Sequence, residues 1–322
     1  SCAVQNNKST LELVTLSQTA FDSTVPKQHT AIITMPGFAS IINTGQGVPN
    51  DKAIQVYFTT GFSDVGVALR DKTTSSDNPE IVQSSDADPT GILVFSTQLT
   101  STMFMYFNAV FAFTKQLDPK SPKIDVSLVS PVYRPVASTE STNTTIASCS
   151  SNQQTWVYYL SGADQDSLRI IQSQIGKQVN TRLQVNNVRV GSSLAAYFDP
   201  QAGLPFVIYQ YMVDGSDDVR QFYEYSVQDE SSTRITNTDD AAKLSSVAAV
   251  HANGVTYLYY MNNDSELRVI TKLRGIWGSS IAVDGASNVN NSSQITAVSS
   301  GNANHVFYTD HNDAPVHLML LY

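Results

Sequence analysis

The chain has 322 residues and a formal net charge of −9, and its charged residues make up 15%, well below the roughly 25% of an average soluble protein. Its polar surface is therefore expected to be mostly neutral. Because no Lys/Arg cluster occurs, the basic stripes that bind a phosphate backbone are missing, which argues against a nucleic acid as partner.

A weak repeat of about fifty residues runs through the sequence, and a period in this range is typical of propellers and solenoids. Each repeat opens with a strand of small residues and continues with an aromatic strand. The openings lie at residues 39–42, 92–95, 145–148, 193–196, 246–249 and 294–297. The sequence therefore predicts an all-β chain in which residues 1–322 form a single domain, a six-bladed β-propeller of four-stranded antiparallel blades.

The first two repeats are less regular than the rest. The first is expected to contain strands at 39–42, 54–58 and 65–70, by the alternation of apolar and polar residues. The second is expected at 92–95, 103–107 and 111–114. After it, Pro131 and Pro135 begin a stretch up to residue 145 that is interpreted as a long surface loop.

The later repeats give clearer strands, separated by hairpins rich in Asn, Asp and Gly, which tolerate the conformations of tight turns. The clearest repeat has strands at 246–250, 255–260, 267–271 and 280–283. Hairpins are expected at 161–164, 214–217, 262–265 and 310–313. Because the chain ends at Tyr322 without a fourth strand for the last blade, the apolar segment at residues 11–16 is predicted to supply that strand and to close the ring.

The repeat at 193–223 resembles one repeat of the fungal fucose-specific lectins in its segments 193–196, 206–210, 214–215 and 219–223. The resemblance implies six blades, with sugar pockets between them built from an Arg of the second strand, a Glu of the third and an aromatic ring. The positions that would carry Arg here hold Gln55, Trp156, Phe206, Tyr257 and His305. Those that would carry Glu hold Ile170, Gln221 and Val269. The resemblance thus implies the fold, together with either a sugar-binding ancestor or a changed ligand.

Aromatic and arginine side chains of the repeats are the candidate ligand-binding residues, since rings pack on the apolar face of a sugar and guanidinium groups bind its hydroxyls. They are Trp156, Arg169, Phe206, Tyr209, Arg220, Tyr223, Tyr257, Arg268 and Trp277. The alternative for the rings is packing between blades. Asp214, Asp217 and Asp218 could supply oxygen ligands to a Ca²⁺ or Mg²⁺ ion, although Asp is also common in turns for conformational reasons.

Three functions remain open: a lectin-like carbohydrate binder, a carrier of an apolar small molecule or pigment in an aromatic pocket or the central cavity, and an enzyme. The five histidines are scattered, and no catalytic motif was found. A start at Ser1 without a signal segment, and without an apolar stretch long enough to span a membrane, predicts a mature secreted protein. Cys2 and Cys149 form either one disulfide or two thiols.

Overall fold

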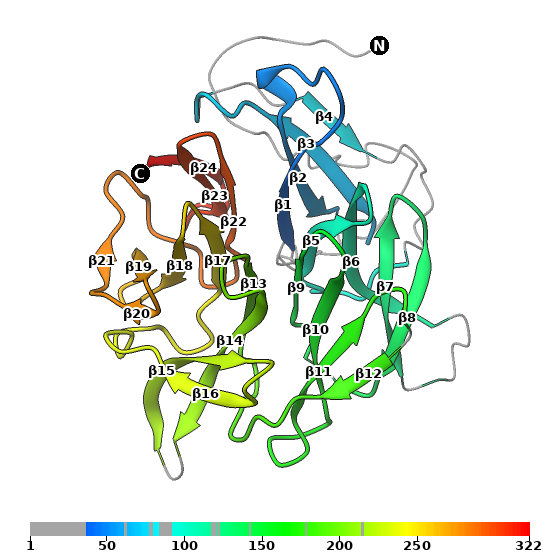
Figure 1. Cartoon of the computed structure of the whole chain (residues 1–322), viewed down its shortest axis with the longest axis vertical. Helices are drawn as coiled ribbons and strands as arrows, with labels where there is room; N and C mark the ends of the chain where they lie inside the picture. Colours follow the sequence, from blue (N-terminus) through cyan, green and yellow to red (C-terminus); the bar gives the residue numbers. More distant parts are fainter. Residues whose placement is uncertain are drawn as a thin grey trace, which may run out of the picture.

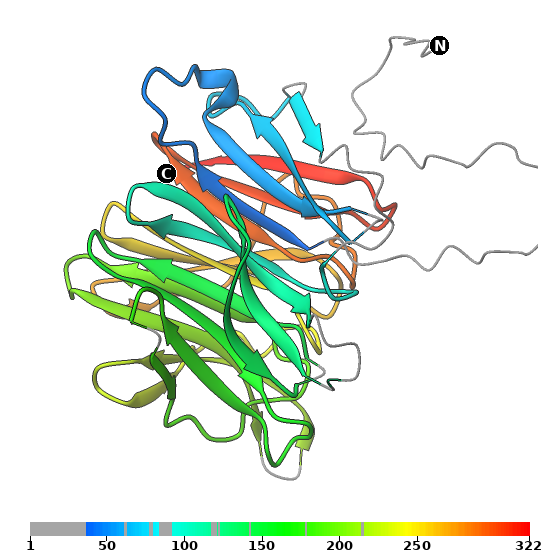
Figure 2. The same ribbon diagram turned by 90° about the vertical axis from the view of Figure 1, so that its right-hand side faces the viewer.

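Six antiparallel sheets, each built from consecutive strands, are arranged as blades around a central channel (Figures 1 and 2). The structure is a computed structural model, and it describes residues 37–322 apart from 61–62, 77–79, 84–91, 117–120, 122, 142, 178 and 214–215. No helix in these ranges is long and apolar enough to cross a membrane. The predicted six-bladed β-propeller is confirmed.

The blades follow one another along the chain. Blade 1 has β1 (Phe38–Ile42), β2 (Ile54–Thr59), β3 (Val65–Arg70) and β4 (Glu80–Gln83), and blade 2 has β5 (Leu99–Phe104), β6 (Phe107–Lys115), β7 (Ile124–Ser130) and β8 (Arg134–Thr139). Blade 3 has β9 (Ile146–Ser150), β10 (Thr155–Ser161), β11 (Arg169–Gln174) and β12 (Val179–Arg182), and blade 4 has β13 (Leu194–Asp199), β14 (Leu204–Val213), β15 (Ser216–Ser226) and β16 (Ser231–Arg234). Blade 5 has β17 (Val247–Ala252), β18 (Val255–Met261), β19 (Leu267–Leu273), β20 (Ile276–Trp277) and β21 (Ile281–Ala282), and blade 6 has β22 (Thr296–Ser300), β23 (Ala303–Thr309) and β24 (Pro315–Leu321). A short 3-10 helix, Asn50–Lys52, precedes β2.

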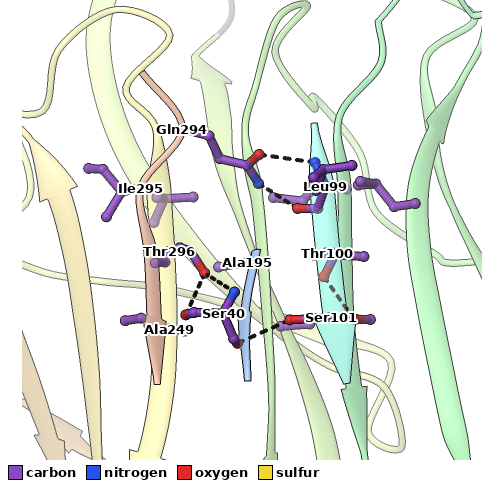
Figure 3. Close-up of a pocket in the computed structure, with 17 residues that line it drawn as sticks. Ser40, Leu99, Thr100, Ser101, Ala195, Ala249, Gln294, Ile295 and Thr296 are labelled. Carbon is purple, nitrogen blue, oxygen red and sulfur yellow. Dashed lines mark hydrogen bonds between the residues drawn. The ribbon is translucent and has the colours of Figure 1, made fainter. Parts of the chain in front are cut away.

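The first strand of every blade lines the channel, which explains why these strands carry small residues. Hydroxyl side chains link neighbouring first strands that share no backbone ladder: Ser40 bonds to Thr296 of blade 6, and Thr100 bonds to Ser148 of blade 3 (Figure 3). The large side chains point instead into the spaces between blades. In β15, for example, Phe222 packs toward blade 5, whereas Tyr225 packs toward blade 3, because alternate residues of a strand face opposite sides. The core is therefore a set of six layers between blades.

The first strand of blade 2 differs from the prediction. Residues 92–95 were expected to form it, but in this stretch Leu93 makes an isolated bridge with Thr114, and the channel is lined by Thr100 and Ser101 of β5. Phe95 is largely exposed. The predicted first strand of blade 2 was wrong, because the strand that faces the axis here is β5, with the small residues Thr100 and Ser101 at the channel.

The predicted surface loop between Pro131 and residue 145 was also wrong in part. Residues 134–139 form β8, the outer strand of blade 2, which pairs with β7. Pro135 is tolerated there because an outermost strand leaves one row of N–H groups without a ladder partner. Proline in this sequence therefore marks an edge of the sheet as well as a turn.

Blade 6 has three strands among the described residues, and the segment at 11–16 that was predicted to complete it lies outside them. Within the described chain, Gln294 joins the last blade to the first two. Its Oε1 atom accepts a hydrogen bond from the N–H group of Phe38 at 2.8 Å. The same atom accepts one from the Leu99 N–H at 3.0 Å, and its Nε2 atom donates to the Leu99 carbonyl at 2.7 Å (Figure 3). One amide side chain thus ties blade 6 to blades 1 and 2.

Cys149 in β9 is a buried free thiol, and Cys2 lies outside the described residues. Burial raises the pKa of the Cys149 thiol, so the reactive thiolate is disfavoured. Of the two alternatives for the cysteines, the structure has the unpaired thiol at this position.

Replacing Gln294 is expected to weaken the ring closure. The change Gln294→Ala leaves backbone groups of Phe38 and Leu99 without their partners, which should lower the free energy of unfolding by about 1–3 kcal/mol in urea denaturation. The matched control is Gln98→Ala, because Gln98 precedes the first strand of blade 2 as Gln294 precedes that of blade 6, and its side chain makes no hydrogen bond in the described chain. Equal stability of the two variants would contradict the role of Gln294.

Candidate functional site

The nine predicted ligand-binding side chains do not converge on one pocket. Between blades 3 and 4, Trp156 stacks on Phe198 with ring centroids 5.9 Å apart, and Tyr223 stacks on Tyr211 at 4.4 Å, next to the fully buried Tyr209. These rings occupy each other's faces. In this interface the alternative of packing between blades describes the aromatic residues better than an open pocket does.

The other predicted residues mostly have protein partners of their own. The Arg169 guanidinium donates to the Leu168 carbonyl at 2.6 Å, and that of Arg220 donates to Asn263 of blade 5. Arg268 forms an ion pair with Asp240 at 3.4 Å. Tyr257 lies 5.5 Å from the ring of Tyr322, between blades 5 and 6. The three guanidinium groups are thus engaged in interactions within the protein.

The predicted metal ligands fall on a hairpin that is only partly described. Asp214 lies outside the described residues, as do the side chains of Asp217 and Asp218. Elsewhere in the described chain, no group of three His, Cys, Asp or Glu side chains could hold a metal ion. The hairpin aspartates that are described stabilise their turns: Asp164 accepts hydrogen bonds from Ser167, and Asp310 accepts them from the backbone of Asn312 and Ala314.

Phe206 and Trp277 do come together, at the interface of blades 4 and 5, around Lys272 of β19. The Lys272 ammonium lies 4.5 Å from the centroid of the Phe206 ring and 5.9 Å from that of Trp277. Phe206 also stacks on Tyr197 of β13, at 5.1 Å. A cation held against several rings gains energy from their π faces, the more so where water is excluded.

A carboxylate from blade 4 neutralises this cation. Glu224 of β15 accepts an ion-pair contact from Lys272 at 2.6 Å, and the side chains of Lys272 and Glu224 are 12% and 7% exposed. The Tyr197 hydroxyl donates to the second Glu224 oxygen at 2.5 Å and lies 3.2 Å from the Lys272 ammonium. Burial and the nearby carboxylate raise the pKa of Tyr197, so its hydroxyl keeps the proton that it donates. Such a buried pair needs every one of these bonds to offset its desolvation.

His251 of β17 forms the next layer of the cluster. Its ring stacks on Tyr197 with an interplanar angle of 3°, its Nδ1 atom bonds to the Thr256 hydroxyl at 2.9 Å, and its Nε2 atom lies 3.9 Å from the Asp199 carboxylate. Burial lowers the pKa of His251, and Lys272 adds to this, while Asp199 acts in the opposite direction. The neutral imidazole is therefore favoured.

Two polar atoms around Lys272 are buried without a hydrogen bond in the described chain: Nε1 of Trp277 and Nε2 of His251. Buried donors rarely remain unpaired in folded proteins, so an unpaired indole N–H beside a Lys–Glu pair suggests a place for a ligand atom. We call the set formed by Tyr197, Phe206, Glu224, His251, Lys272 and Trp277 the blade 4–5 cluster. It brings an acceptor, a cation, an unpaired donor and aromatic rings together within one interface.

Sequence reasoning found Phe206 and Trp277 but missed the polar members of the cluster. A signal was present in the alternation of residues, because Glu224 shares a strand face with Phe222, and Lys272 shares one with Ile270. Both apolar residues are buried toward the same interface. A charged residue at a position that faces the buried side of a strand indicates an ion pair or a functional site.

The central channel is a narrow cavity of about 80 Å³ between the six first strands, with Ala195, Ala249 and Ser101 on its wall (Figure 3). No charged or aromatic residue is among its lining residues. At ~30 Å³ for each water molecule, the cavity holds two or three waters. It is too small for a pigment molecule, so the central cavity does not suit the predicted alternative of an apolar carrier.

The Lys272–Glu224 pair is expected to behave as a unit in a double-mutant cycle. Because each single change leaves one buried charge without its partner, Lys272→Met or Glu224→Gln should lower the free energy of unfolding by about 3–5 kcal/mol. The double variant should recover most of that loss. Chemical denaturation of the four proteins checks this, and additive losses would show that the two charges do not interact.

The lowered pKa of His251 predicts a pH dependence of stability. Below the ordinary value of 6.5, the unfolded chain binds a proton at His251 more readily than the folded chain, so the contribution of His251 to stability is full above that pH and is lost as the pH falls below it. In His251→Gln this loss should be absent. Thermal unfolding between about pH 7.5 and 5, a range that brackets the pKa of the unfolded chain, measures how the melting temperature of each protein changes with pH. An equal change in the wild type and in His251→Gln would refute the assignment.

Comparison with known proteins gives relatives by structure alone. No family model matches the sequence, and no curated protein matches it. Among solved structures, the chain is similar to the fucose-specific lectin from Aleuria aurantia, with 16% identity, a TM-score of 0.61, and 89% of this chain and 91% of that chain covered. It is also similar to AofleA from Arthrobotrys oligospora, with 12% identity, a TM-score of 0.60, and 90% and 84% covered.

A further structure of the Aleuria aurantia lectin, described as having a six-bladed β-propeller fold, has 13% identity, a TM-score of 0.55, and 77% and 78% covered. At these identities the likeness is one of fold. The chain therefore has the six-bladed propeller architecture seen in fungal fucose-binding lectins, as the resemblance of its repeats implied.

Proposed function

We propose that this chain is a secreted, lectin-like protein without enzymatic activity, which binds a neutral sugar at the blade 4–5 cluster. The observation that carries the proposal is the Lys272–Glu224 pair, flanked by Phe206 and by Trp277 with its unpaired indole N–H. The solved structures of similar fold include lectins described as fucose-specific or bound to methyl fucoside, which supports a sugar as ligand.

The chemistry of the cluster suits a hydroxylated ring. A carboxylate accepts hydrogen bonds from sugar hydroxyls, an ammonium and an indole N–H donate to them, and aromatic rings pack on the C–H face. The resemblance to fucose-specific lectins implied an Arg, a Glu and a ring; here the cation is Lys272, contributed by blade 5 to the carboxylate of blade 4. Because the Lys272 and Glu224 side chains are nearly closed to solvent, we expect one hydroxylated edge of the sugar to reach them.

The alternative of an apolar carrier lacks a comparable observation. The large rings between blades 3 and 4 stack on one another, and the central channel holds only a few waters. For the further alternative of an enzyme, the described residues contain no group of three His, Cys, Asp or Glu side chains that could hold a catalytic metal ion. We therefore retain carbohydrate binding as the proposed function.

A glycan array tests the proposal with the wild-type protein and the double variant Lys272→Met/Glu224→Gln. The double variant is used because neither charge is left buried alone, so it should stay folded. We expect the wild type to bind a fucosylated or other neutral glycan, and the variant to bind it at least about tenfold more weakly, as for the loss of charge-assisted hydrogen bonds.

The matched control is Lys243→Met, which removes an exposed lysine between blades 4 and 5 and should leave binding unchanged. Circular dichroism confirms folding of each variant. The proposal fails when the wild type binds no glycan, or when the folded double variant binds as the wild type does.

A further inference from the structure

The mouth of the central channel has the features of a second ligand site, away from the blade 4–5 cluster. We propose that this mouth, called the vestibule below, binds a neutral polyhydroxylated molecule: a single sugar residue or a polyol. The inference is independent of the proposed function, since no residue of the vestibule belongs to the blade 4–5 cluster.

The vestibule is a cavity of about 280 Å³ at the end of the channel where the first strands begin. Each blade contributes to it the residue that precedes its first inward-facing position: Gly37, Gln98, Thr145, Ser193, Ser246 and Gln294. Its volume lies close to the lower end of the ~300–1,000 Å³ range of small-molecule pockets. The blade 4–5 cluster lies toward the opposite ends of the first strands, where His251 is next to the last residue of β17.

Hydroxyl and amide residues predominate in the vestibule lining, and apolar surface lies between their polar groups. None of its fifteen lining residues is charged, although the chain as a whole carries a net charge of −9. A charged ligand would therefore find no opposite charge in the cavity. An apolar ligand would strip water from hydroxyl and amide groups without replacing their hydrogen bonds, which is costly. A neutral molecule with several hydroxyls fits both constraints.

One side of the vestibule satisfies its own hydrogen bonds. Gln294 is bound to Phe38 and Leu99, and the Ser246 hydroxyl accepts a hydrogen bond from the N–H of Ile295 at 2.7 Å. These groups hold neighbouring blades together. Their hydrogen bonds are made within the protein.

The side formed by blades 3 and 4 is different. Thr145 and Ser193 are each only 4% exposed, yet within the described chain neither hydroxyl makes a side-chain hydrogen bond. The Asn143 Oδ1 atom accepts from the N–H of Thr145 at 3.0 Å, which fixes the amide, and its buried Nδ2 atom has no partner. Because β9 and β13 are neighbours in the ring, these groups lie on adjacent walls of one cavity.

Comparison of equivalent positions shows that the hydroxyls of this wall are not needed for the ring. Ser193 occupies in blade 4 the place that Ser246 occupies in blade 5, where the hydroxyl is used to bind the next blade. A hydroxyl group that has no protein partner and is accessible from a cavity can bind a water or ligand atom there. Leu244, 45% exposed on the rim, adds an apolar contact for the C–H face of a sugar.

The experiment uses the full chain and the variant Thr145→Val/Ser193→Ala, with methyl β-D-galactopyranoside, methyl α-L-fucopyranoside and glycerol as probes in ligand-observed NMR. We expect at least one probe to bind the wild type, and its affinity to fall about tenfold or more in the variant, since two donors to the ligand are lost. The same loss should be seen when Thr145→Val/Ser193→Ala is added to the double variant Lys272→Met/Glu224→Gln, in which binding at the blade 4–5 cluster is already weakened.

A stability measurement separates a ligand site from a structural one. Because the two hydroxyls make no bond to the protein, their removal should leave the denaturation midpoint unchanged or raise it. The proposal is overturned when no probe binds the wild type, when the vestibule variant binds as well as the wild type, or when binding disappears only in the Lys272→Met/Glu224→Gln variant. A lowered midpoint in the vestibule variant also counts against it, because it would make the hydroxyls structural.

Discussion

The convergence of six strands on one axis is the constraint on which the rest of the structure depends. It favours small side chains at the channel, such as Ser40, Ala195 and Thr296, and it forces the large rings outward into the spaces between blades. Where first strands meet without a backbone ladder, hydroxyl side chains and the amide of Gln294 make the connection instead. Architecture and core composition thus follow from crowding at the centre.

The same constraint explains how much of the fold could be predicted from the sequence. Strands with an alternating pattern and tight hairpins, as in blade 5, were found close to their observed bounds, although its fourth strand is divided into β20 and β21. In blade 2, hydrophobicity favoured residues 92–95 over Leu99–Phe104. A run of apolar residues was used as the signal for a strand, whereas the strand at the channel has small polar residues. Local propensity could not reveal which strand faces the axis.

Prediction of the candidate site was limited by a different cause. Phe206 and Trp277 were recognised as aromatic residues of strands, but their meeting with Glu224 and Lys272 depends on how blade 4 is placed against blade 5. Forty-eight residues separate the two charged residues along the chain. The family pattern of Arg and Glu, which was sought within one repeat, directed attention away from a pair shared by two repeats.

On the proposed function, the blade 4–5 cluster also bears on how many glycans one chain can bind at once. In the described chain, the buried Lys–Glu pair occurs at one of the six interfaces, whereas the other interfaces have stacked rings or other polar contacts. A repeat protein with equivalent sites on every blade gains avidity from simultaneous engagement, by factors of about 10²–10⁴. On the proposed function, a chain with one such interface forgoes that gain between its blades, and it should not agglutinate cells through this site unless its copies associate.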